Sequence, residues 1–291
     1  MLFKGKTAIV TGATSGIGLG IVRGLAESGA DVILNSFTDT AQDHALAQSI
    51  AAEFKVTARY VCADMRDGQA CRQLLADVGR CDILVNNAGV QHVAPIDQFP
   101  IDQWDDIIAI NLTSAFHTTA AALPMMRAAG WGRVVNIASA HGLTATPFKS
   151  AYVAAKHGVV ELTKTVALET AEEPITANAI CPGYVLTPLL EAQLPATMEK
   201  YDMDRDEVIK QVILERQPSR QFATVEQLAG TCCFLYSDAA DQITGTTISM
   251  DGGWTAMCSK SQCVERQQRL SARWTSSVGL TARTLVADQS I

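Results

Sequence analysis

Positive charge and long apolar runs are both scarce in this chain. Thirty acidic residues outnumber 23 Lys and Arg residues, and the net charge of −7 argues against a nucleic-acid-binding role. No apolar run approaches the roughly 20 residues that a membrane-spanning helix requires. The opening residues, Met1–Lys6, form neither a secretory apolar segment nor a small-residue cleavage site. These absences predict a cytoplasmic protein that binds no nucleic acid and no membrane.

Paired cysteine motifs are also missing. No Cys-x-x-Cys spacing occurs, and several of the cysteines lie in apolar runs. We therefore expect buried free thiols rather than a disulfide framework or a zinc site, and we expect no bound metal. The eight cysteines are at positions 62, 71, 81, 181, 232, 233, 258 and 263.

Short β-rich runs alternate with amphipathic helical stretches along most of the chain. This alternation is typical of a parallel sheet covered by helices on both faces, so we expect one doubly wound α/β domain over residues 1–256. The predicted strands are Thr7–Val10, Val32–Asn35, Ala58–Cys62, Ile83–Asn86, Val134–Ala138, Thr176–Ile180 and Thr247–Met250. The predicted helices lie near residues 17–28, 41–54, 68–78, 103–129, 151–171 and 224–236.

Two segments break this rhythm. Residues 186–221, which contain Pro188 and Pro195, are rich in Leu, Glu, Gln and Lys. They predict a helical insertion after the sixth strand, where α/β proteins place substrate lids. The tail 257–291 carries five cationic and two acidic side chains, and it has little apolar periodicity. We expect this basic tail to be mobile.

Tyr152 and Lys156 are four residues apart, and Ser139 lies thirteen positions upstream of Tyr152. Positions i and i+4 of a helix share one face. A neighbouring ammonium favours phenolate, so we expect the pKa of Tyr152 to fall from about 10 toward the working pH. Such a tyrosine can act as the acid–base of a carbonyl/alcohol interconversion, with Ser139 holding the substrate oxygen. Taken alone, a tyrosine and a lysine at this spacing are far more often a pair on a helix surface than a catalytic pair.

A glycine-rich turn, Thr11–Gly18, joins the first predicted strand to the first helix. Glycines at this place let the backbone approach a pyrophosphate at the helix N-terminus. Asp64 follows the third strand, where it could bind an adenine amino group. Asn86–Gly89 follows the fourth strand; a simple Asx turn is the alternative reading of its asparagines. Together these segments predict a dinucleotide site.

These motifs, with Asn111 and Pro182-Gly183, resemble the short-chain dehydrogenase/reductase family over about residues 4–256. The resemblance implies a Rossmann-type fold and a catalytic set of Asn111, Ser139, Tyr152 and Lys156, in which Asn111 helps to hold a water. It implies that Thr187 binds the nicotinamide carboxamide. The implied cofactor contacts are Gly12, Thr14, Ser15, Gly16, Ile17, Gly18, Phe37, Asp64, Met65, Asn87, Ala88, Gly89, Tyr152, Lys156, Pro182, Gly183, Val185 and Thr187.

Neither of the usual signals for the type of cofactor is present. No basic residue stands at Ser15 or just after the second strand, where the sequence reads Asn35-Ser36-Phe37-Thr38. The acidic residue that usually holds the ribose hydroxyls is absent there as well. Because nothing cationic would neutralise the 2′-phosphate of NADP, the sequence favours NAD.

A polar and cationic group surrounds the predicted nicotinamide position: Gln91, His141, Lys149 and Gln193. Solvated surface residues are the bland alternative, but a lysine with these partners suits a small carboxylate. The surrounding runs resemble bacterial members of the family that act on 3-hydroxybutyrate. That resemblance implies substrate contacts from Gln91, Ser139, His141, Lys149, Tyr152, Gln193 and Trp254. Tyr184 departs from it, because those enzymes usually have tryptophan there, and so does the tail.

The implied activity is the NAD-dependent interconversion of (R)-3-hydroxybutyrate and acetoacetate by hydride transfer, in a homotetramer. Two alternatives remain. A 3-ketoacyl thioester reductase of the same family would need no carboxylate clamp but would need a cationic 2′-phosphate site. A catalytically idle dinucleotide-binding interaction protein would keep the fold and lose the chemistry.

Overall fold

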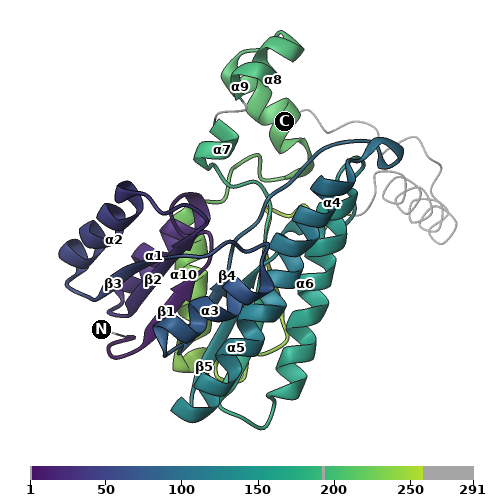
Figure 1. Cartoon of the computed structure of the whole chain (residues 1–291). Helices are drawn as coiled ribbons and strands as arrows, with labels where there is room; N and C mark the ends of the chain where they lie inside the picture. The colour runs from purple at the N-terminus through teal and green to yellow at the C-terminus, as the bar shows by residue number, and fades with distance from the viewer. Residues whose placement is uncertain (1, 192–193, 258–291) are drawn as a thin grey trace, which may run out of the picture. The chain divides into compact units, whose positions relative to one another are not determined.

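Parallel strands form a single sheet in the part of the chain that the computed structural model describes, residues 2–191 and 194–257 (Figure 1). Seven strands are described, in the order β3-β2-β1-β4-β5-β6-β7, and every neighbouring pair is parallel. This confirms the predicted doubly wound fold. The strands are β1 (Thr7–Val10), β2 (Asp31–Ser36), β3 (Ala58–Cys62), β4 (Ile83–Asn86), β5 (Gly132–Ile137), β6 (Ile175–Pro182) and β7 (Thr247–Met250). Residues Met1–Thr255 make one compact unit.

Helices cover both faces of the sheet (Figure 1). Side chains alternate along each strand, so Ala8 and Val10 of β1 join one core cluster and Ile9 joins the other. The first cluster packs against α1 (Gly16–Glu27), α2 (Ala41–Phe54) and α10 (Val225–Tyr236). The second packs against α3 (Gly68–Val78), α5 (Ser114–Ala129) and α6 (Ser150–Glu169).

The helix predicted over 103–129 is interrupted. The structure has α4 (Ile101–Ile108), then a π-helical turn η2 (Ala109–Thr113), and then α5. Asn111 lies in this wide turn, and its amide is buried. A π turn inside an α-helix often marks a functional position, and no periodicity in the sequence foretold it.

By length and composition alone, the helical stretch Ile101–Ala129 could cross a membrane, which the sequence reading had not anticipated. In this fold several apolar side chains of the stretch pack into the core. Ala122, Leu123 and Met126 are buried in the core beneath the sheet, where α5 packs beside α3. One apolar helix of this kind is weak grounds for a membrane span, because a core helix has the same composition.

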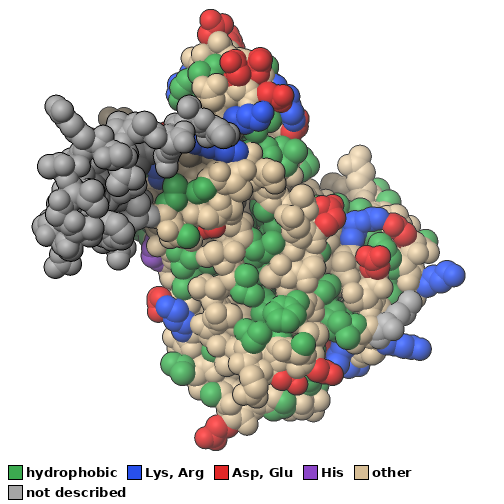
Figure 2. Space-filling view, turned by 180° about the vertical axis from the view of Figure 1, so that it is seen from behind, with side chains coloured by type: hydrophobic (Ala, Val, Ile, Leu, Met, Phe, Trp, Pro, Cys, Tyr) green, Lys and Arg blue, Asp and Glu red, His purple; other side chains and the backbone are tan. Residues whose placement is uncertain are grey.

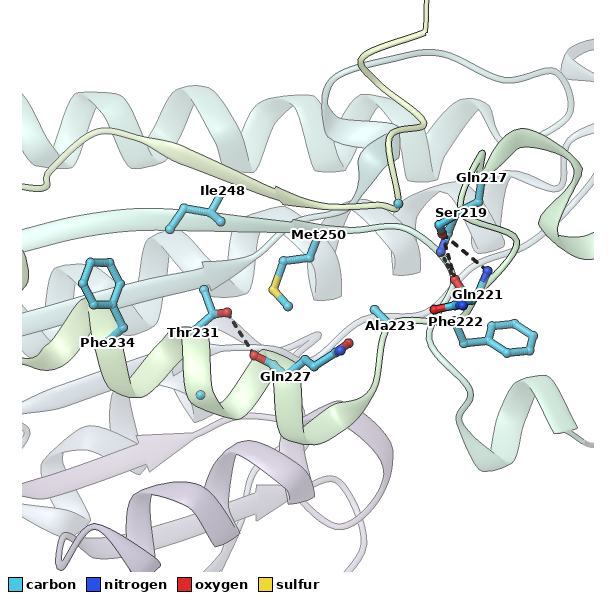
Figure 3. A pocket seen from close by; sticks show the side chains of 12 residues that line it. Gln217, Ser219, Gln221, Phe222, Ala223, Gln227, Thr231, Phe234, Ile248 and Met250 are labelled. Carbon is cyan, nitrogen blue, oxygen red and sulfur yellow. Dashed lines mark hydrogen bonds between the residues drawn. The ribbon is translucent and has the colours of Figure 1, made fainter.

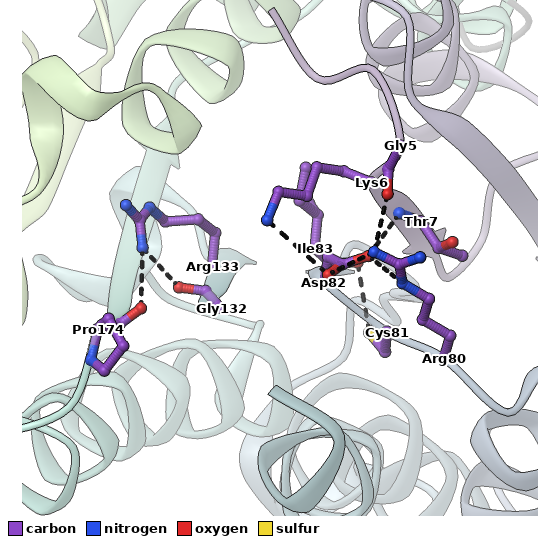
Figure 4. Close-up of polar contacts among 10 residues, drawn as sticks. All are labelled: Gly5, Lys6, Thr7, Arg80, Cys81, Asp82, Ile83, Gly132, Arg133 and Pro174. Carbon is purple, nitrogen blue, oxygen red and sulfur yellow. Dashed lines mark hydrogen bonds and ion pairs between the residues drawn. The ribbon is translucent and has the colours of Figure 1, made fainter. Parts of the chain in front are cut away.

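Two separate groups of charged side chains lie at the amino ends of the strands (Figure 4). Asp82, just before β4, is fully buried and accepts hydrogen bonds from Thr7 N and Arg80 Nε, both at 2.8 Å. Arg133 of β5 is also buried, and its Nη1 donates to the backbone oxygen of Gly132 at 2.8 Å. These contacts lie at the opposite end of the sheet from the loops that carry the predicted motifs, so they brace the strands without entering the site.

A series of short helices lies within the insertion predicted over 186–221, in residues 188–191 and 194–216. Val208 and Leu214 are buried and anchor it, while its outer side chains are charged and crowd the top of the view in Figure 2. Arg220 Nη1 donates to the backbone oxygens of Lys210 and Leu214 and closes the segment. The helices are α7 (Pro188–Glu191), α8 (Leu194–Tyr201), α9 (Arg205–Glu207), η4 (Val208–Val212) and η5 (Ile213–Arg216).

The cysteines within the described residues are free thiols. Cys71, Cys81, Cys181 and Cys232 are buried, as expected, and burial raises the pKa of Cys181 to about 11. The expectation of burial is wrong for Cys62, which is exposed at the end of the outermost strand β3. Within the same residues, no group of three His, Cys, Asp or Glu side chains could hold a metal.

Candidate active site

The site begins where the strand order reverses, between β1 and β4. Hydrogen bonds join the two loops that leave these strands. Thr11 Oγ1 accepts from the backbone N–H groups of Asn87 and Ala88, both at 3.0 Å. Asn87 Nδ2 donates back to the oxygens of Thr11 and Gly12, both at 2.9 Å. The carboxyl ends of strands at such a reversal form the crevice in which α/β proteins bind nucleotides.

The glycine turn is shaped by close backbone approach. A Cβ on Gly18 would lie 2.3 Å from the Gly12 oxygen and 2.5 Å from Asn87 Nδ2. Gly12 has a positive φ of 61°, and a Cβ there would lie 2.9 Å from Ala88 Cα. Ser15 begins α1 without a side-chain cap, so the first N–H groups of the helix are not satisfied by it. This turn, whose backbone forms a cradle between Gly12 and Gly18, fits a pyrophosphate group.

The loops after β2 and β3 hold the residues expected at the adenosine end. Phe37 is 71% exposed, as a ring that offers its face to a ligand would be, whereas Met65 is buried in the core. Asp64 Oδ2 accepts from Arg66 Nη2 at 2.6 Å, and this contact lowers the pKa of the Asp64 carboxyl. Arg66 was not singled out from the sequence, and it means that Asp64 already has a cationic partner.

Three of the four predicted catalytic residues meet at the carboxyl end of β5. Ser139 follows β5, and its Oγ accepts from the His141 N–H at 3.1 Å and hydrogen-bonds the Tyr152 side chain. Tyr152 and Lys156 share one face of α6, with Lys156 Nζ 5.7 Å from the centre of the Tyr152 ring. Lys156 Nζ also donates to the Ile137 oxygen at 2.7 Å. A hydroxyl, a phenol and an amine are thus held together in a buried place.

The pKa of Tyr152 differs from the expectation drawn from the sequence. Burial raises the pKa of Tyr152, and its hydrogen bond with Ser139 opposes only part of that rise. Burial lowers the pKa of Lys156 to about 8. The prediction that Lys156 brings the pKa of Tyr152 down toward neutrality is therefore wrong for this structure. Withdrawal from water disfavours the charged form of both groups, so Tyr152 is held as a neutral phenol.

Asn111 fixes the loop after β4. Its Nδ2 donates to the Val90 oxygen and its Oδ1 accepts from the Val90 N–H, both at 2.9 Å. Nδ2 and Oδ1 can each form a further hydrogen bond, so the water that the family resemblance implies stays a prediction. A Cβ on Gly89 would lie 3.6 Å from both Asn111 Oδ1 and Lys156 Nζ, which places Asn111 within the catalytic group.

Aromatic rings build one wall beside the catalytic tyrosine. The His141 ring meets the Tyr152 ring edge to face at 6.1 Å and the Trp254 ring at 5.0 Å. Tyr184 stacks on Trp254 at 5.5 Å with an interplanar angle of 14°. Burial lowers the pKa of His141 to about 4, so this imidazole is neutral at pH 7. His141 Nδ1 is buried and has no hydrogen-bond partner among the described residues.

Lys149 stands at the start of α6, directly after a strained turn. Phe148 has a φ of 67°, which is uncommon for a non-glycine residue, and its oxygen accepts from Ala94 N at 3.0 Å. Lys149 is half-buried, and its pKa is lowered by burial and then by the charge of Arg216. Gln91 is exposed and forms no hydrogen bond with the described residues of this group. Gln193 lies outside the described residues, as does the tail after Met257.

Two neighbouring residues of the insertion were missed by the sequence reading. Gln217 is 1% exposed, and its Oε1 accepts from Tyr184 N at 3.0 Å, which holds the turn after β6. Arg216 Nη1 donates to Thr146 Oγ1 at 3.1 Å, in the loop before Lys149. No spacing in the sequence links these residues to the site, because they reach it from a different segment of the fold.

A separate pocket of about 760 Å³ opens between α10 and β7 (Figure 3). Gln217, Gln227, Phe234, Ile248 and Met250 are among its lining residues. Ser139, Tyr152 and Lys156 do not line it, so its size is no guide to where the chemistry takes place. The candidate active site is the place where Ser139, Tyr152 and Lys156 meet.

The chain belongs to the short-chain dehydrogenase/reductase family, because residues 6–197 match the family described as short chain dehydrogenase. Curated relatives cover nearly all of the described chain. The D-beta-hydroxybutyrate dehydrogenase of Rhizobium meliloti (strain 1021) is 53% identical over 255 residues, 86% of this chain and 99% of the relative. The enzyme of the same name from Cupriavidus necator is 51% identical over 259 residues, 88% of this chain and 100% of the relative.

A solved structure shares both fold and sequence with this chain. The putative 2-deoxy-d-gluconate 3-dehydrogenase from Agrobacterium tumefaciens, solved with bound NADP, matches with a TM-score of 0.76 and 38% identity. The match covers 87% of this chain and 98% of that chain. The likeness agrees with the strand order and with the glycine turn at the strand reversal.

Proposed function

We propose that this protein is an NAD-dependent 3-hydroxybutyrate dehydrogenase that interconverts (R)-3-hydroxybutyrate and acetoacetate. The observation that carries the proposal is Lys149, a half-buried cation one helical turn from the half-buried phenol of Tyr152. If Lys149 binds the carboxylate of a short hydroxy acid, the hydroxyl group of that acid would lie next to the acid–base group of Tyr152. The names of the two D-beta-hydroxybutyrate dehydrogenase relatives point to the same substrate.

The cofactor site fits a nicotinamide dinucleotide. The cradle of Gly12 and Gly18 would receive the pyrophosphate, and Phe37 would lie at the adenosine end. A Cβ on Gly16 would lie 3.5 Å from Thr187 Cγ2, so Thr187 stands over the glycine turn, in reach of the nicotinamide half. When bound, the oxidised nicotinamide accepts a hydride from the substrate. The choice of NAD over NADP rests on the absence of Lys or Arg in Ser36–Thr38 after β2 and at Ser15.

The catalytic residues of the chain handle the proton. In the direction of reduction, Tyr152 Oη donates its proton to the forming alkoxide oxygen, and Ser139 Oγ steadies that oxygen. In the direction of oxidation, Tyr152 must first lose its proton, which burial disfavours. Lys156 Nζ, held on the Ile137 oxygen, supplies the positive charge that stabilises the phenolate. The wall of Trp254 and Tyr184 keeps the apolar side of the substrate out of water.

Initial rates test this proposal most directly. The purified protein is assayed with (R)- and (S)-3-hydroxybutyrate, each with NAD and with NADP, and for reduction with a 3-ketoacyl thioester and NADPH. We expect turnover of the (R) acid with NAD to exceed every other combination. Faster reduction of the thioester would support the ketoacyl reductase alternative, and no turnover of any substrate would support the idle binding protein. The homotetramer remains a prediction, which light scattering would test.

A further inference from the structure

Arg216 connects the insertion to the loop that carries Lys149. It is the last residue of η5 and is exposed, and its Nη1 donates to Thr146 Oγ1 at 3.1 Å. Thr146 lies three residues before Lys149, in the stretch between η3 (Ala140–Gly142) and α6. The guanidinium of a residue from the insertion is thereby fixed beside the entrance to the candidate site.

The charge of Arg216 acts on several side chains of that site. After the effect of burial, it is the cause that lowers the pKa of Lys149, and it contributes to the lowered pKa of His141. It also opposes the raised pKa of Tyr184, whose ring stacks on Trp254. These side chains come from separate segments, so the charge of Arg216 lies close enough to act on all of them.

Neither Lys149 nor Arg216 forms an ion pair with a described residue. Another arginine of the insertion behaves differently, because Arg205 Nη2 lies 2.8 Å from Glu191 Oε1. Two cations held near each other without an anion repel one another. An anion placed between them would relieve this repulsion and gain two charge-assisted contacts.

We propose that Arg216 is a second carboxylate-binding residue of this site and acts with Lys149 on the acid group of the substrate. The identity of that substrate rests on the proposed function, whereas the anion-binding role of Arg216 rests on its hydrogen bond to Thr146 and on its charge near Lys149. Arg216 therefore determines specificity: it favours a free acid over an ester, an amide or a thioester. The insertion contributes to recognition through this side chain, in addition to covering the site.

Butyrate is a probe that does not depend on turnover. It has the carboxylate and the chain length of the substrate but no hydroxyl group, and butyramide is its uncharged counterpart. Dissociation constants of both are measured by ligand-observed NMR on the NAD-loaded protein. The variants are Arg216→Gln, Arg216→Lys and Lys210→Gln. Lys210 is an exposed cation of η4 that forms no ion pair with the described part of the chain, so its variant controls for the loss of one charge from the insertion.

We expect Arg216→Gln to weaken butyrate binding about 5- to 10-fold, the low end for a charge-assisted contact because Arg216 is exposed. Arg216→Lys should lose less, because it keeps the charge without the planar fork. Butyramide binding should change less than about 2-fold in every variant, and Lys210→Gln should match the wild type. Unchanged butyrate binding in Arg216→Gln, or an equal loss in Lys210→Gln, would overturn the proposal.

Activity separates this inference from the proposed function. If the wild type oxidises (R)-3-hydroxybutyrate, Arg216→Gln should lower kcat/KM about 10-fold for the acid and less than about 3-fold for its methyl ester. An equal loss for both would contradict the role of Arg216 and leave the function standing. If the wild type oxidises neither enantiomer but Arg216→Gln still weakens butyrate, the function is wrong and the carboxylate site stands.

Discussion

Replacing Thr11 with valine would remove the oxygen that joins the two loops of the cofactor crevice. Thr11 is 2% exposed, and valine has nearly the same shape, so packing is preserved. The backbone N–H groups of Asn87 and Ala88, now bonded to Thr11 Oγ1 at 3.0 Å, would lose their acceptor. A buried donor left without a partner costs about 1–3 kcal/mol. Because Asn87 and Ala88 are only half-buried, water replaces part of each bond, and we expect a total loss of about 2 kcal/mol.

Thr11→Ser is the matched control, because it keeps the oxygen and removes one methyl group, at a cost of about 1 kcal/mol. The free energy of unfolding is measured by urea denaturation without cofactor, and the dissociation constant of NAD by calorimetry. We expect Thr11→Val to be the less stable variant and to bind NAD at least about 5-fold more weakly, since the loop must be reordered on binding. A valine variant as stable as the serine variant, with unchanged affinity for NAD, would refute the argument.

Other residues lead to further tests. Tyr152→Phe removes the acid–base hydroxyl and should lower kcat at least about 100-fold with NAD affinity nearly intact; retention of more than a tenth of the turnover would contradict its role. Lys149→Ala should cut kcat/KM about 10- to 150-fold for the acid and much less for its ester, so an equal loss on both would remove the carboxylate clamp. The pKa of His141 is about 4 in the folded protein and about 6.5 when unfolded. The unfolded chain therefore binds more protons, and stability should fall by about 3 kcal/mol from pH 6.5 to pH 4; His141→Gln should flatten this slope in urea titrations. Since burial raises the pKa of Tyr152, oxidation should accelerate as the pH rises above 7, and a flat profile would argue against Tyr152 as the base.

Local patterns in the sequence determined much of this protein. Short, near-continuous apolar runs placed the strands, and β1, β3, β4 and β7 begin and end where expected. The glycine turn, Thr11–Gly18, was recognisable because its backbone geometry depends on residues next to one another in the chain. Tyr152 and Lys156 could be paired for the same reason, since helical spacing alone sets their common face.

Tertiary structure decided the rest. The two hydrogen bonds between the Asn111 amide in the π turn and the backbone of Val90 depend on the loop that follows β4. The stack of Tyr184 on Trp254 joins distant segments, as does the reach of Arg216 to Thr146. The pKa of Tyr152 went against the sequence expectation for a related reason. Spacing shows which charge lies near a group, but only packing determines how much water is withdrawn from it, and here the loss of water raises the pKa of Tyr152.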